Sequence, residues 1–73
     1  MKIYQNVNGN SGIAGYEIGD TYIEVEFADT GSVYRYSYKS AGRENVEEMK
    51  RLAAQGHGLH SFINRRVKYL YEN

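Results

Sequence analysis

Residues 21–27, with the sequence TYIEVEF, decide the fold class. Apolar side chains occupy every second position, at Ile23, Val25 and Phe27, and polar or tyrosine side chains fill the positions between them. A period of two is that of a β-strand. The alternation predicts a strand with one face on the core and one face in solvent, as is typical of an antiparallel sheet.

A glycine turn predicts the preceding strand. Gly19 and Asp20 fit a two-residue hairpin of type II′, because glycine adopts the positive φ that the first central position requires. The pairs are then Ile18 with Thr21, Tyr16 with Ile23, and Ala14 with Val25. The apolar positions of both strands share one face in this register, so turn chemistry and hydrophobic pattern agree.

A second turn, centred on Thr30 and Gly31, predicts the following strand. The core-facing pairs are then Phe27 with Tyr34, Val25 with Tyr36, and Ile23 with Tyr38, so all three tyrosines face inward. On the outer face Glu26 lies opposite Arg35, and Tyr22 lies opposite Lys39. We therefore expect a three-stranded antiparallel meander over residues 13–39.

After residue 39 the hydrophobic period becomes helical. Asn45 and Glu48 have the spacing of a capping box, and an apolar stripe follows at Val46, Met49, Leu52 and Ala53. Gly56 is expected to end this helix, since glycine adopts the left-handed conformation after a helix C-terminus. A second helix is expected over residues 58–69, with Leu59, Ile63, Val67 and Leu70 on one narrow face and Phe62 at its margin.

These elements predict an α+β fold, in which two amphipathic helices follow the meander and pack on one face of its sheet. We expect one domain over residues 1–73, with a lead-in or short strand at 1–12, the meander at 13–39 and a helical half at 43–70. Within the lead-in, residues 6–12 are rich in Asn and Gly and are expected to form a loop after a short strand at 2–7.

Composition excludes several classes of protein. The chain has 73 residues and no cysteine, which excludes a disulfide framework, a thiol nucleophile and a cysteine-based zinc site. No apolar run approaches the length of a membrane span, and no signal-peptide core follows Met1, so we expect a cytoplasmic protein.

Catalytic chemistry has little support. His57 and His60 are the only imidazoles, and no third metal ligand stands near them in sequence. Glu24 and Glu26 share the exposed face of a strand, where cross-strand compensation by Arg35 explains them better than an acid–base pair. Ser40 and Ser61 lack a nucleophile motif. We expect no enzyme, no metal and no cofactor.

A net charge of zero conceals an uneven distribution. Residues 1–30 carry one lysine against five acidic residues, whereas residues 31–73 carry eight basic residues against four acidic ones. The candidate phosphate contacts are Arg65, Lys68, Lys50 and Arg51, whereas Arg66 is expected to lay its stem over the core edge. Gly58 and His60 lie where backbone N–H groups at a helix start can bind anions, but an ordinary turn between helices is the favoured interpretation of this segment.

The eight tyrosines suggest a stacking platform for single-stranded RNA. The predicted register favours core packing instead, because it places Tyr34, Tyr36 and Tyr38 beneath the helices. Stacking stays open if the helices leave part of that face uncovered, or if Tyr22, Tyr69 and Tyr71 do the stacking.

Several short motifs, in this order and spacing, resemble the KTSC domain, a short bacterial domain named after the C-terminus of some lysyl-tRNA synthetases. They are Ser11–Gly12–Ile13, Gly15–Tyr16, the strand at 23–27, Gly31 before Tyr34–Arg35–Tyr36, Gly58–Leu59, the segment 62–67 with Phe62 and Asn64, and Tyr69. The family has no established catalytic residues, and its attachment to a tRNA synthetase suggests RNA binding only by association.

Two functions follow as hypotheses. The first is a small non-enzymatic module that binds RNA or another polyanion weakly through its basic helical half. The second is a protein-interaction module that uses the edge of the third strand or the loop at 56–62, with Asn64, His60 and Tyr71 on one flank of the second helix.

Overall fold

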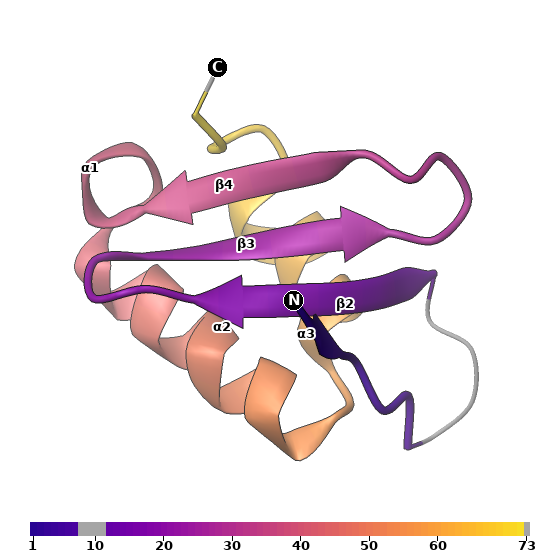
Figure 1. Cartoon of the computed structure of the whole chain (residues 1–73). Coiled ribbons are helices and arrows are strands. Elements are labelled where there is room, and N and C mark those ends of the chain that lie inside the picture. The colour runs from indigo at the N-terminus through magenta and orange to yellow at the C-terminus, as the bar shows by residue number, and fades with distance from the viewer. Residues whose placement is uncertain (8–11, 73) are drawn as a thin grey trace.

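A computed structural model describes residues 1–7 and 12–72 of the chain. The elements follow in the order β1 (Lys2–Ile3), β2 (Ile13–Ile18), β3 (Tyr22–Phe27), β4 (Val33–Ser37), α1 (Tyr38–Ala41), α2 (Arg43–Gln55), α3 (Leu59–Phe62) and the π-helix η1 (Ile63–Val67). Figure 1 shows the sheet in front, with α2 and α3 behind it. The fold is α+β, as the sequence predicts.

The described strands form a four-stranded antiparallel sheet in the order β1-β2-β3-β4. The expected meander supplies three of them, and the short strand expected within residues 2–7 is the fourth. It covers only Lys2 and Ile3, which pair with Tyr16 and Gly15. The expected loop over residues 6–12 includes residues 8–11, which lie outside the described part of the chain.

The predicted register between β2 and β3 is wrong by two residues. Tyr16 lies opposite Val25 and Ile18 opposite Ile23. The Gly19 N–H donates to the Tyr22 carbonyl, so the turn centres one residue later than expected. A slip of two residues keeps each side chain on its face, which is why the predicted core positions of β3 survive.

A register shift between Ile13 and Gly15 also corrects the predicted start of β2. Ile13 pairs with Phe27 and is 1% exposed, whereas Ala14, predicted opposite Val25, has no partner in the ladder. A bulge of this kind lets two residues of one strand oppose one residue of its neighbour. The larger aliphatic side chain of Ile13 thereby enters the core.

The register between β3 and β4 is also shifted by two residues. Tyr34 lies opposite Val25, Tyr36 opposite Ile23, and Arg35 opposite Glu24 instead of Glu26. The turn centres one residue earlier than expected, since the Phe27 N–H donates to the Ser32 carbonyl and the Gly31 N–H donates to the Phe27 carbonyl.

The third strand ends earlier than predicted. Ser37 accepts a hydrogen bond from the Ser40 N–H, and the Ser40 hydroxyl accepts one from the Ser37 N–H, which together form a capping box. Tyr38 therefore opens α1 and does not face Ile23, and Lys39 lies on α1 and not opposite Tyr22. The predicted pairs of Tyr38 and Lys39 are wrong for this reason.

Helix α2 carries the predicted stripe. Its buried residues are Val46, Met49, Leu52 and Ala53. Gly56 ends the helix at φ 84°, and its N–H donates to the Leu52 carbonyl, as expected. The predicted capping box at Asn45 is wrong, because Gly42 is the N-cap and the Asn45 amide donates to the carbonyl of Ala41, the last residue of α1.

The second helix departs from a plain α-helix. It begins at Leu59 and widens into η1 from Ile63 to Val67. Leu59, Ile63 and Val67 are buried at a constant spacing of four residues, as predicted. Leu70, predicted on the same face, is 42% exposed because the helix ends at Val67, whose carbonyl accepts from the Leu70 N–H.

The core joins both layers. Tyr4, 2% exposed, packs among the residues of the sheet and the helices, and its hydroxyl accepts a hydrogen bond from the Leu59 N–H. No helix among the described residues combines the length and the apolar character that crossing a membrane requires.

Candidate functional site

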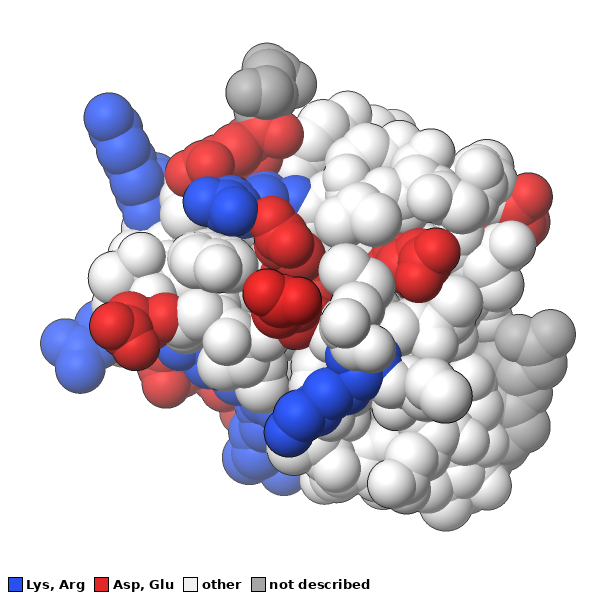
Figure 2. All heavy atoms as spheres, viewed as in Figure 1, with Lys and Arg blue, Asp and Glu red and all other residues white. Residues whose placement is uncertain are grey.

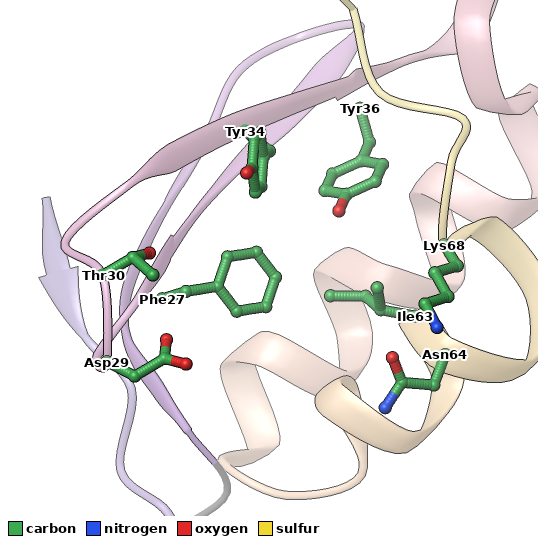
Figure 3. A pocket seen from close by; sticks show the side chains of 8 residues that line it. All are labelled: Phe27, Asp29, Thr30, Tyr34, Tyr36, Ile63, Asn64 and Lys68. Atoms are coloured by element: carbon green, nitrogen blue, oxygen red, sulfur yellow. The ribbon is translucent and has the colours of Figure 1, made fainter.

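A pocket of about 250 Å³ lies between the end of β3, the strand β4 and the helix η1. Figure 3 shows aromatic side chains on its sheet side and helical side chains opposite them. Its lining residues are Phe27, Asp29, Thr30, Tyr34, Tyr36, Ile63, Asn64 and Lys68. Four candidate residues of the sequence analysis meet here: Tyr34 and Tyr36 of the tyrosine motif, Asn64, and Lys68.

The tyrosines of β4 differ in their burial. Tyr36 is 1% exposed and belongs to the core, as predicted, whereas Tyr34 is 36% exposed. The ring of Tyr34 stacks on Tyr71 at 4.6 Å between centroids and meets Phe27 at 5.5 Å. Tyr34 shares the helix-facing side of the sheet, but the helices do not cover it fully. The face therefore stays partly open, which is one of the conditions under which the stacking hypothesis remains possible.

The Tyr36 side chain contributes a polar group to the pocket. Its hydroxyl forms no hydrogen bond with any residue of the described chain. Burial raises the pKa of Tyr36 to about 12, and the neighbouring Tyr34 and Tyr71 add to the shift. The hydroxyl is therefore neutral and able to donate throughout the physiological range.

Two predicted phosphate contacts, Lys50 and Arg51 on α2, already have partners. The Lys50 ammonium lies 3.0 Å from Glu47 and donates to the Asp20 carbonyl at 3.1 Å, so it ties α2 to the turn between β2 and β3. Arg51 pairs with Glu48. This pairing raises the pKa of the Arg51 guanidinium and lowers the pKa of the Glu48 carboxyl.

The basic residues after Asn64 differ from Lys50 and Arg51 in having no carboxylate partner among the described residues. Arg65, Arg66 and Lys68 are exposed, and none of them forms an ion pair within residues 1–7 and 12–72. Lys68 lies 5.4 Å from the Tyr69 ring centroid. The expected structural role of Arg66 is wrong, because the wider turn of η1 places its side chain in solvent and not over the core edge.

Backbone groups in and directly after the glycine turn at residues 56–58 form hydrogen bonds with other residues of the chain. The Leu59 N–H that follows Gly58 donates to the Tyr4 hydroxyl, and the His57 carbonyl accepts from Gln55. His60 is half-buried, with its ring edge-on to Phe27 at 6.0 Å. The described residues hold no group of three or more metal-ligating side chains. Phe62 packs against the core and does not line the pocket.

The opposite face of the sheet carries the acidic half. Figure 2 shows acidic side chains gathered over the middle of this face. Glu17 lies directly opposite Glu24, which accepts two hydrogen bonds from Arg35 at 3.0 and 2.8 Å. The Glu24 hydrogen bond raises the pKa of the Arg35 guanidinium, which also covers the Tyr22 ring at 4.0 Å. Arg35 thus occupies one face of the Tyr22 ring.

The edge of β4, a candidate for strand addition, is occupied at one position. The Glu72 N–H donates to the Arg35 carbonyl at 2.7 Å, so the C-terminal segment lies along this strand. Tyr71 belongs to the same segment, and its ring stacks on Tyr34 and lies edge-on to Tyr36. A partner strand would have to displace this segment from the edge.

Sequence reasoning did not identify Asp29, Thr30 and Ile63 as pocket residues, nor Phe27 as more than a core residue. The sequence predicts Asp29 and Thr30 as turn residues only. They line the pocket because the turn between Phe27 and Ser32 lies beside η1, a contact that no local pattern of the sequence indicates.

Comparisons of the chain with protein-family models, with curated proteins and with solved structures found no match. The resemblance to the KTSC domain therefore stays a prediction.

Proposed function

We propose that this protein is a small binding module that holds single-stranded RNA weakly, through the exposed cations Arg65, Arg66 and Lys68 and the aromatic pocket beside them. One observation carries the proposal. Lys68 lines an aromatic pocket and follows two exposed arginines that have no carboxylate partner in the described chain. Cations beside accessible aromatic rings are the usual means of binding single-stranded nucleic acid.

The distribution of ion pairs refines the predicted contacts. Lys50 and Arg51 would have to give up carboxylate partners before they could bind phosphate, whereas Arg65 and Lys68 would not. The acidic face of the sheet lies on the other side from the helices and would repel a polyanion. Binding is therefore assigned to the η1 side of the molecule.

The proposal is tested by titrating a short single-stranded RNA of mixed sequence and measuring affinity by fluorescence anisotropy at several salt concentrations. We expect the logarithm of the affinity to fall linearly with the logarithm of salt, with a slope of about −0.7 for each phosphate contact. Arg65→Gln and Lys68→Gln should each weaken binding and reduce the slope by about one contact.

Lys39→Gln is the matched control. It makes the same change in charge on an exposed residue of α1, at the other end of β4 from the pocket. Lack of binding at low salt, or an equal loss in the control, would contradict the proposal. A pull-down that returns one protein partner, unaffected by nuclease, would favour the protein-interaction hypothesis.

A further inference from the structure

The Tyr36 hydroxyl is a polar group of the pocket that has no hydrogen-bond partner among the described residues. Tyr36 is 1% exposed, and its hydroxyl finds no partner in the described residues. None of the fully enclosed polar side-chain atoms described lacks a partner, so this oxygen must touch the open space of the pocket. Buried polar groups are nearly always hydrogen-bonded in native proteins. The hydroxyl is therefore available to form a hydrogen bond with a ligand that enters the pocket.

The size of the pocket limits the ligand. Pockets that hold a whole drug-sized molecule have volumes of roughly 300–1,000 Å³. The present pocket, at about 250 Å³, is slightly smaller and suits a single planar ring system. Phe27, Tyr34 and Ile63 supply apolar walls for such a ring, as Figure 3 shows.

The polar groups limit the ligand further. Asp29 and Asn64 lie on opposite sides of the Phe27 ring in Figure 3, with Lys68 next to Asn64. An ionised carboxylate only accepts hydrogen bonds, whereas an ammonium and a tyrosine hydroxyl donate them. The ligand must therefore present N–H donors toward Asp29 and an acceptor toward the donor groups.

Among the nucleobases, guanine fits this arrangement best. Its ring N1–H and its exocyclic amino group are adjacent donors, and its O6 and N7 are acceptors. Adenine offers an amino group but no neighbouring N–H on the same edge. The pyrimidines present a smaller ring to the apolar walls.

We propose that the pocket binds one unstacked guanine base, with Asp29 accepting from its N–H donors and with Tyr36, Asn64 or Lys68 donating to its oxygen and nitrogen acceptors. This proposal rests on the RNA-binding function proposed above, because it takes the guanine to be one base of a bound RNA strand. The base itself can be tested without any polymer.

The direct test titrates the protein with guanosine, adenosine, cytidine and uridine monophosphates and follows the amide and side-chain chemical shifts of the pocket. We expect guanosine monophosphate to bind about tenfold more tightly than the other three, the size of one good hydrogen-bonded base contact. Asp29→Asn should abolish this preference, because the amide presents a donor where the carboxylate only accepts. Asp20→Asn is the matched control, since it removes the same charge from the exposed turn between β2 and β3.

Tyr36→Phe separates binding from folding. The substitution removes only the hydroxyl, which has no partner in the described chain, so the resistance to urea should stay equal or rise. Binding of guanosine monophosphate should weaken severalfold. A loss of stability without a loss of binding would assign the hydroxyl a structural role and overturn its part in the proposal.

A last measurement distinguishes this proposal from the proposed function. Short oligouridylates with a single central guanosine, adenosine or uridine are compared at one salt concentration. Equal affinity for all three would overturn the guanine pocket and leave RNA binding standing. Binding of guanosine monophosphate without binding of any oligomer would overturn RNA binding and leave the pocket standing.

Discussion

Gly31 and Gly56 share a positive φ, at 71° and 84°, and differ in their surroundings. A Cβ atom on Gly31 would meet nothing within 4 Å, whereas one on Gly56 would lie 2.9 Å from the Gln5 Cβ. Alanine costs about 1–2 kcal/mol in this conformation, and a close contact with a packed side chain adds a cost of similar size. We expect Gly31→Ala to cost about 1 kcal/mol and Gly56→Ala about 3 kcal/mol.

Urea denaturation of both variants measures this difference. The excess at Gly56 reports how closely the segment after β1 packs on the end of α2, since the Val7 N–H also donates to the Gly56 carbonyl. An equal decrease in the free energy of unfolding of both variants would show that this packing does not stabilise the fold.

Tyr36 makes stability depend on alkaline pH. Burial raises the pKa of Tyr36 from an ordinary value of about 10 to about 12, so the neutral form is favoured in the folded state. The resulting stability is fully present below pH 10 and is lost as pH rises through 12. A shift of this size corresponds to at most about 3 kcal/mol.

An absorbance titration of tyrosinate checks this shift. One of the eight tyrosines should ionise well above the others while the protein stays folded, and that step should disappear in Tyr36→Phe. A titration of the wild-type protein in which no tyrosine lags behind the rest would contradict the burial argument.

At the scale of elements, the switch from β4 to α1 depends on Ser37. Its hydroxyl accepts from the Ser40 N–H at 3.0 Å, and the residue is 7% exposed. Removing a serine N-cap costs about 1 kcal/mol, because a helix N–H loses its partner. We expect Ser37→Ala to lower the free energy of unfolding by about that amount.

Ser61→Ala is the control, since Ser61 is exposed in the middle of α3 and should change stability by less than about 0.5 kcal/mol. The two variants are compared by their urea midpoints. If Ser37→Ala matched the control, the capping box would not be what ends the strand.

At the scale of the whole molecule, Tyr4 joins layers that are distant in sequence. It lies in the same core cluster as residues of the sheet and of α2, α3 and η1. Its hydroxyl accepts a hydrogen bond from the N–H of Leu59, the first residue of α3. Truncating a buried aromatic residue costs about 3–5 kcal/mol. The stability of a chain of this length is roughly 4–11 kcal/mol in total.

Tyr4→Ala should therefore leave the protein close to unfolding at room temperature. Ile3→Ala is the matched control, because Ile3 is next in the chain, 81% exposed, and should be nearly neutral. Circular dichroism during heating measures both variants. A Tyr4→Ala protein that unfolded like the control would mean that the N-terminal segment is peripheral to the core.

The sequence by itself determined which residues are buried within each element. The alternation at 23–27 and the spacings of Val46, Met49 and Leu52 and of Leu59, Ile63 and Val67 identify core faces correctly. These patterns are local, because strand and helix periods depend only on neighbours along the chain. For the same reason a register wrong by two residues did not disturb them.

Only the tertiary structure decided how the elements meet. The β3–β4 turn centres one residue earlier than its residues suggest, and the Ser37 cap removes Tyr38 from the strand. The pocket lies where this turn and β4 meet the helix η1. It brings Asp29 next to residues 34 or more positions later in the chain, and such contacts depend on which hydrogen bonds close each turn and not on composition or period.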